Sequence, residues 1–441
     1  MRFWIKLGFV FAMTLAILVP LGLIDGVIDD RQRNRAEAVA QIATTFAGGQ
    51  VFGGPVLVVP YTDSVEVEVA DAGGGTRKVR RDERFEWTYF PDSLVVGGSL
   101  KPSTRRLGLH AVRIYEWTGR ADARFTVDIP AAKDPLANRR IGQPWLSYGI
   151  ADVRGLVGTP RLSVNGTPTP VLQGQGSRDG TGVHARLPSP SAGSRLRLAT
   201  RMDLVLGGTE SLSLVPLGEQ NRFSLSSSWP HPRLAGRFPA RQPQIGADGF
   251  AAQWAIPALA ADAQRQYRSG RALNEIDAAN VSLVDPVNPY TQADRAIKYG
   301  ILFVLLTFVG FFMLELLLQL RIHPIQYGLV GLALSIFFLL LVSVSEHVAF
   351  GLAYVLASTA CVGLIGYYLC HVLGNFWRGV GFAMTLGALY AALYGLLISE
   401  DNALLMGSLL LFAILAGIMV ATRKVDWYRA GASVPAAGPL A

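Results

Sequence analysis

The sequence predicts a membrane protein of the α + β class. It would have an N-terminal signal-anchor helix, a large, mainly antiparallel and sandwich-like β domain, and a C-terminal bundle of five transmembrane helices. Residues 301–422 contain six charged side chains and no lysine. Residues 25–298 are instead rich in Arg, Asp, Gly, Pro and Ser, and a separate apolar stretch occupies 4–24. This distribution describes membrane segments at both ends of a large water-soluble part.

Six segments are apolar enough to cross a bilayer as helices, which takes about 20 residues each. They are residues 4–24, 299–320, 325–344, 348–369, 379–398 and 403–421. We assign 1–24 to a transmembrane signal anchor, 25–49 to a helical stalk, 50–297 to the β domain, 298–422 to the bundle and 423–441 to a tail. The first span could also be a cleaved signal peptide. Its core of about 18 residues is longer than most signal cores, so we expect it to stay.

The short loops of the bundle predict its orientation, because Lys and Arg collect on the cytoplasmic side. Arg2 and Lys6 precede the first span, and the expected inner loops and tail carry Arg321, Arg378, Arg423, Lys424 and Arg429. The opposite turns, "SEH" and "SED", carry only acids and a histidine. We therefore expect both termini in the cytoplasm and the large domain on the other side. Arg295 and Lys298, at the start of the second span, are the exception.

The segment between the spans alternates short β-type runs with turn residues. "PVLVVPY" is typical of a buried strand, and "SVEVEV" alternates with a period of two. Further runs are separated by Gly, Pro, Asn and Asp, which favours an antiparallel sandwich. The β residues could form two lobes, about 50–130 and 150–256.

Composition and motifs disfavour several classes of function. The formal net charge is +8, but the arginines are scattered and no lysine tract is present, so we expect no nucleic-acid partner. The two cysteines, Cys361 and Cys370, are about 13 Å apart along a helix, too far for a disulfide. The chain has no G-x-S-x-G, H-E-x-x-H, P-loop or C-x-x-C motif. We therefore predict no catalytic residue, cofactor or metal ion.

The polar island "SVSEH", residues 343–347, separates two apolar stretches. Glu346 and His347 could be a catalytic or metal-binding pair, a proton relay, or part of the turn between two spans. We expect the turn, since a metal site needs more ligands. We further expect Glu346 to lie at the level of Arg295 and Lys298 and to pair with one of them.

Two other features are candidate functional residues. Glu315 is a carboxylate inside a span, which is costly and often functional. The alternative is that it reaches toward the interface, or pairs with Arg321 or with another span. In "SSSWPHPRLAGRFP", 226–239, the residues Trp229, His231 and Arg233 could form a ligand rim, or a rigid loop that packs the Trp and exposes the Arg.

Three stretches are together specific: "VSLVDPVNPYTQADRAIKYG", the region from "RIHPIQYGLV" to "GLIGYYL", and "SSSWPHPRLAGRFP" followed by "GFAAQW". They resemble the CreD family of bacterial inner-membrane cell envelope integrity proteins. "GGPVLVVPY" also fits. The resemblance implies a role in an envelope-stress response, linked with a two-component regulator, colicin tolerance and β-lactam response. It supplies no catalytic residue.

The leading hypothesis is a non-enzymatic factor of the inner membrane whose periplasmic domain binds an unidentified periplasmic or envelope partner. Apart from this partner we expect contact with the lipid bilayer, and the sequence leaves the oligomeric state open. The alternative is a transporter or flippase-like protein for an amphipathic envelope substrate. An envelope enzyme acting on peptidoglycan or lipid is a third hypothesis, disfavoured because no acid, base or nucleophile motif is present.

Overall fold

The computed structural model describes residues 3–70, 76–108, 110–132, 138–283, 289–318, 322–399 and 403–423. The chain divides into two compact units. The membrane unit consists of Met1–Asn34 and Val287–Ala441, and the β unit is Arg35–Pro286. The tail expected at 423–441 lies outside the described residues from position 424 onward.

Helix α1 (Phe3–Thr45) is 43 residues long and contributes to both units. Its first half is the expected anchor, and its second half, "DGVIDDRQRNRAEAVAQIATT", is the expected stalk, rich in residues with good helix propensity. Gly48 and Gly49 follow its end. The side chain of Arg154 donates to the carbonyl of Thr44 at 2.7 Å, so a cation satisfies the last turn of the helix.

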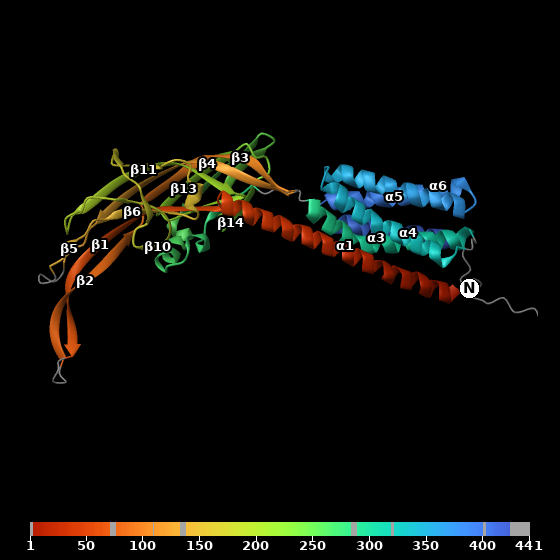
Figure 1. Ribbon diagram of the computed structural model, residues 1–441, viewed down its shortest axis with the longest axis horizontal. Helices are drawn as coiled ribbons and strands as arrows, with labels where there is room; N and C mark the ends of the chain where they lie inside the picture. The colour runs from red at the N-terminus through yellow and green to blue at the C-terminus, as the bar shows by residue number, and fades with distance from the viewer. Residues whose placement is uncertain are drawn as a thin grey trace, which may run out of the picture. The chain divides into compact units, whose positions relative to one another are not determined.

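The described residues of the C-terminal part of the membrane unit form helices joined by short turns. The helices are α3 (Pro289–Leu318), α4 (Pro324–Ser345), α5 (Phe350–Val372), α6 (Phe376–Ile398) and α7 (Ala403–Thr422). Five helices of the described chain have the length and composition of a span, namely α1 and α3 to α6, whose axes run alongside one another in Figure 1. Over its described part, Leu405–Val420, α7 is a shorter apolar helix. The predicted fold class is confirmed, with five spans counted in place of the expected six.

Aromatic rings fill the centre of this bundle. Tyr390 of α6 meets Phe303 of α3 and Phe337 of α4, with ring centroids 4.5 and 4.7 Å apart. Tyr354 of α5 lies 5.5 Å from Phe337. All three pairs are edge-to-face, the geometry that aromatic quadrupoles favour. Because lipid gives little hydrophobic drive between helices, such packing holds the bundle together.

Within its described residues, the β unit contains two sheets. The nine-stranded sheet has the order β14-β17-β12-β1-β6-β10-β9, with β2 and β5 also pairing with β1. Its strands are β1 (Gln50–Ala70), β2 (Thr76–Tyr89), β5 (Arg140–Ile141), β6 (Trp145–Ile150), β9 (Leu172–Gln175), β10 (Arg178–Arg186), β12 (Ser211–Val215), β14 (Arg233–Gly236) and β17 (Ala279–Ser282). A short helix, α2 (Ala263–Arg268), precedes β17.

The eight-stranded sheet has the order β15-β16-β13-β3-β4-β11-β7-β8. Its strands are β3 (Ser93–Leu107), β4 (His110–Asp128), β7 (Arg161–Val164), β8 (Thr167–Thr169), β11 (Arg195–Thr209), β13 (Gln220–Ser227), β15 (Arg241–Gly246) and β16 (Gly249–Pro257). Most neighbours are antiparallel, as predicted, but β1 with β12 and β3 with β13 are parallel. Both sheets are therefore mixed.

The largest apolar core among the described residues of the β unit lies between the two sheets. Phe52 of β1, in the first sheet, packs edge-to-face against Trp117 of β4, in the second, with centroids 5.5 Å apart. Along β4, buried and more exposed residues alternate over most of the strand, as expected when one face covers a core. The sandwich-like architecture is confirmed.

The strands of the two considered lobes, 50–130 and 150–256, are intermixed. In the first sheet β1 lies between β12 and β6, and in the second β3 lies between β13 and β4. Each sheet thus contains strands from both ranges, and the whole of Arg35–Pro286 forms one unit. Over the described residues, the parallel pairings join early strands to late ones, so the two ranges do not form separate sheets.

The hairpin of β1 and β2 continues past the rest of its sheet. Its register runs from Leu57↔Tyr89 to Ala70↔Thr76. On the other side of β1, the short strand β5 pairs only with Tyr61 and Thr62. From Asp63 onward, the described residues of β1 pair with β2 alone. This part is therefore a two-stranded ribbon, drawn as the long red-orange hairpin in Figure 1.

Candidate functional sites

The "SEH" island covers the end of α4 and the turn after it, and the side chains of Ser345 and Glu346 are buried. Glu346 is the C-cap residue of α4, and its side chain is 7% exposed. Nε of Arg31, on α1, lies 3.1 Å from Oε1 of Glu346, and the hydroxyl of Tyr290 donates to the same oxygen at 3.4 Å. His347 is exposed, with Nδ1 3.2 Å from the carbonyl oxygen of Ser343. The carboxylate therefore joins α1, α3 and α4.

The partner of Glu346 differs from the one we expected. The ammonium group of Lys298 lies 2.7 Å from Asp294, one helical turn earlier on α3, and Asp25 and Asp29 of α1 are within its electrostatic reach. Arg295 is half-buried beside Asp294. We call Arg31, Tyr290, Asp294, Lys298 and Glu346 the rim cluster. Of the two expected cations, the cluster contains Lys298, and Arg295 follows Asp294 directly in the sequence, but Arg31 supplies the ion pair to Glu346.

Glu315 is buried in the membrane unit, with 6% exposure. The hydroxyl of Tyr327, on α4, donates to Oε2 of Glu315 on α3 at 2.8 Å. Tyr327 in turn packs against Phe311, with centroids 4.7 Å apart. The carboxyl group therefore pairs with a neighbouring span, which is one of the structural alternatives considered above. Arg321, the other partner considered, lies outside the described residues.

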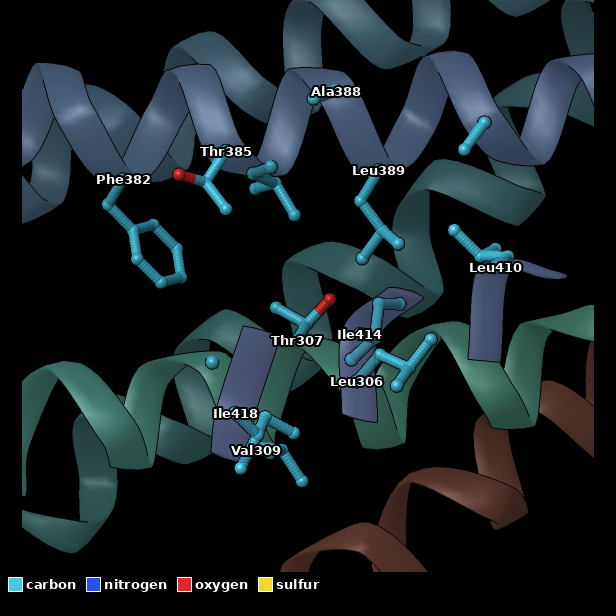
Figure 2. A pocket seen from close by; sticks show the side chains of 13 residues that line it. Leu306, Thr307, Val309, Phe382, Thr385, Ala388, Leu389, Leu410, Ile414 and Ile418 are labelled. Carbon is cyan, nitrogen blue, oxygen red and sulfur yellow. The ribbon is translucent and has the colours of Figure 1, made fainter. Parts of the chain in front are cut away.

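An apolar crevice of about 300 Å³ lies between α3, α6 and α7. In Figure 2, side chains from the three helices converge on it, including Phe382 and Leu389 of α6 and Ile414 of α7. Its polar side chains are Thr307 and Thr385. We call this feature the bundle crevice.

In the β unit, Trp229 is held by its surroundings. Its indole Nε1 donates to the carbonyl of His231 at 2.9 Å, and the guanidinium of Arg113 lies 4.1 Å from its ring centroid. The ring is half-buried against the sandwich core. His231 and Arg233 are exposed, and Arg233 opens strand β14. The three residues lie close in sequence on one loop and strand, with the Trp packed and the other two facing solvent.

A second cleft lies at the base of the β1–β2 ribbon. Tyr61 stacks on Trp87 with ring centroids 3.8 Å apart. Arg139 places its guanidinium 4.8 Å from the Tyr61 ring centroid and binds Asp63 through two nitrogens, Nε at 2.8 Å and Nη2 at 2.5 Å. These hydrogen bonds raise the pKa of Arg139. Beside them is a hollow of about 480 Å³ along the edge of β1, facing Pro130. We call it the ribbon cleft.

Sequence reasoning missed Arg31, Tyr327, Asp63 and Arg139. Arg31 lies on a stalk helix full of charges, and nothing in its spacing distinguishes it from its neighbours. Tyr327 had one available signal. It lies near the start of the helix that follows Glu315 after a short turn, and antiparallel neighbours meet near their turn. Asp63 and Arg139 are 76 positions apart, and only the sheet brings them together.

In the part of the chain that the structure describes, no group of three or more His, Cys, Asp or Glu side chains is placed to hold a metal ion.

Comparison with known proteins gives a family. The family model described as "Inner membrane protein CreD" matches residues 2–428. The curated "Inner membrane protein CreD" of Escherichia coli (strain K12) is 34% identical over 430 residues, which cover 97% of this chain and 94% of that protein.

Solved structures give much weaker similarity. A zinc metallopeptidase of the M1 class from Deinococcus radiodurans is 9% identical, with a TM-score of 0.18 over 44% of this chain and 42% of its own. Yeast LTA4 hydrolase in complex with bestatin is 5% identical, with a TM-score of 0.17 over 48% and 34%. The chain matches under half the length of these proteins, and similarity of this size carries no argument about fold or activity.

Proposed function

The chain belongs to the CreD family of inner membrane proteins, and from that premise we propose that it is a non-enzymatic envelope-integrity factor of the envelope-stress response. Its β unit would lie in the periplasm, with both termini in the cytoplasm, and would bind a periplasmic or envelope partner. The membrane unit would anchor the chain or pass on the binding event. The distribution of Lys and Arg in the short loops supports this orientation.

The ribbon cleft is the observation that carries the binding role. It combines stacked aromatic rings, a charged pair and an open strand edge in one hollow of about 480 Å³. Pockets of this size with a few convergent polar groups are the usual form of a binding site. Arg139 also donates to the carbonyl of Ala131 at 3.0 Å, which fixes this segment against the ribbon. The cleft is therefore preorganised, and a partner would lose little of its binding energy to ordering it.

The test is capture of partners from envelope-stressed cells, with variants of the cleft. Ser64→Trp fills the hollow, and Trp87→Ala removes half of the aromatic stack. Ile245→Ala, at an exposed position on β15, is the matched control. Partners are captured by crosslinking and detergent extraction. We expect the two cleft variants, present at normal abundance, to capture no partner and to fail to rescue a deletion strain.

The control should keep both the captured partner and the rescue. If cleft variants that fold normally rescue the strain and capture the same proteins as the wild type, the binding role of the cleft is wrong.

A transporter or flippase-like role is the second candidate, and one observation favours it. Glu315 is buried between helices and hydrogen-bonded to Tyr327, and ionisable residues that face a bundle interior often mark substrate or proton pathways. The two candidates differ in what neutralising Glu315 would do, which is set out in the Discussion.

A further inference from the structure

The bundle crevice is built by small residues on two facing helices. Gly310 of α3 and Ala388 and Ala392 of α6 line it, and a Cβ added at Gly310 would meet no atom within 4 Å. Larger side chains at these positions would fill the hollow. The crevice therefore exists because these three residues are small, and a larger residue at any of them should close it.

The third wall is a helix that is only loosely packed. The side chains of α7 that face the crevice are Leu410, Ile414 and Ile418, spaced four residues apart along one helical face. Each is half-buried, and no described residue between 405 and 420 is fully buried. The crevice thus opens to the surroundings of the bundle beside α7.

The crevice has apolar walls, and both of its threonines direct their hydroxyls to their own helix. Thr307 donates to the carbonyl of Phe303 at 2.9 Å, and Thr385 donates to that of Gly381 at 3.0 Å. Both hydroxyl donors are already used within their helices. A polar ligand buried here would lose its hydrogen bonds to water and gain none from these donors, which costs free energy. A hydrocarbon chain has no such cost and gains dispersion contacts along the walls.

We propose that the bundle crevice binds one acyl chain of a bilayer phospholipid. An apolar cavity of roughly 150 Å³ holds a benzene molecule, so about 300 Å³ fits a chain segment of about twice as many carbon atoms. Because the chain belongs to an inner membrane family, phospholipid is the hydrocarbon present around α7. The bound chain takes the place of the packing that α7 does not provide. This proposal rests on the crevice and on the family, and is independent of any partner of the β unit.

The test uses purified protein in vesicles of phosphatidylethanolamine and phosphatidylglycerol that contain a phospholipid with a photoreactive diazirine near the end of one acyl chain. After irradiation, peptide mass spectrometry locates the adducts. We expect adducts concentrated on Ala388, Ala392 and the facing part of α3. Gly310→Leu, which fills the crevice, should reduce labelling of Ala388 and Ala392 by about tenfold, the equivalent of about 1.4 kcal/mol.

Gly363→Leu is the matched control, because Gly363 lies on an exposed face of α5 with no atom within 4 Å of an added Cβ. It should leave the labelling of α6 unchanged. If Gly310→Leu does not fold, Ala392→Leu fills the same space from α6 and takes its place, with Gly310 and Ala388 as the labelled positions. The proposal is wrong if a folded variant with a filled crevice is labelled there as strongly as the wild type. It is also wrong if the wild type is labelled as strongly at Gly363 as in the crevice.

Discussion

The Nε atom of Arg31 lies 3.1 Å from Oε1 of Glu346 and joins helix α1 to the end of α4. The carboxylate is 7% exposed, while the arginine is 39% exposed. Glu346 therefore needs the ion pair more than Arg31 does, because a buried charge without a partner is strongly destabilising. The hydroxyl of Tyr290 shares the same oxygen and adds α3 to the contact.

Removing the cation should therefore weaken the membrane unit. Arg31→Ala is expected to lower the free energy of unfolding by about 2–4 kcal/mol, because Glu346 would stay buried beside a single hydroxyl. Thermal unfolding in detergent measures it. Arg33→Ala is the control, since Arg33 and its partner Asp30 are both exposed and such pairs contribute under about 1 kcal/mol.

A charge swap separates pairing from simple loss of a side chain. Glu346→Lys alone should impair stability and rescue of a deletion strain, and adding Arg31→Glu should restore part of both. If adding Lys298→Glu restores more than adding Arg31→Glu, the pairing seen here is not the one that matters.

Neutralising Glu315 distinguishes the two candidate functions. Glu315→Gln keeps an oxygen that can accept the hydrogen bond from Tyr327. An envelope factor should keep its abundance and rescue the deletion strain. A protein that moves protons or charged substrates should lose function at normal abundance, and that result would favour the transporter. Tyr327→Phe, which leaves the buried acid without this donor, should cost about 1–3 kcal/mol in thermal unfolding in either case.

The ribbon cleft depends on the two-nitrogen contact of Arg139 with Asp63. Arg139→Lys should loosen it, because an ammonium group cannot reproduce the planar fork of the guanidinium. Hydrogen exchange of backbone amides around Tyr61 and Trp87 should become faster. Arg140→Lys is the control, because Arg140 pairs with Asp82 at an exposed position. Equal exchange in the two variants would show that the contact does not fix the cleft.

The end of α1 should respond to pH through Asp152. The hydrogen bond from Arg154 lowers the pKa of Asp152. A carboxylate whose pKa is lowered by folding adds stability above its unfolded pKa of about 3.9, and this stability is lost as the pH falls through the folded value. In the Asp152→Asn variant, the last backbone amides of α1 should therefore undergo hydrogen exchange faster than in the wild type at pH 7. This difference should shrink below about pH 4. A difference that stays constant with pH would rule out the charge as its cause.

Cysteine labelling tests the proposed orientation. In a background with Cys361→Ser and Cys370→Ser, Leu259→Cys should react with an impermeant thiol reagent added from the periplasmic side, because this position is fully exposed on the β unit. Ala432→Cys, in the tail, should react only after the membrane is opened. The opposite pattern would reverse the topology and remove the periplasmic partner from consideration.

The membrane spans and the class of the β unit could be predicted because they depend on local composition. A span needs only length and apolar side chains, and a strand at a core needs only alternation. The contact of Lys298 with Asp294 was also within reach, since residues four apart on a helix are neighbours.

The rest depends on contacts between segments that are distant in sequence. Arg31 meets Glu346 because α1 packs beside α4, where Ile17 would lie 2.8 Å from a Cβ added at Gly331. No property of either helix alone selects that face. Likewise, alternation in β3 predicts a strand but not its parallel neighbour β13, because a period of two carries no information about partner or direction.

The intermixed strand order also determines when the β unit can form during synthesis. β1 pairs with β12, which pairs with β17, so the nine-stranded sheet is incomplete until Ser282 has left the ribosome. Pairings this distant make folding slow and leave strand edges open meanwhile. A chain that ends at residue 130 would contain β1 to β4 but lack the strands that pair with them, such as β12, β13 and β11. Until the late strands arrive, the open edges of the early strands are therefore exposed to non-native pairing.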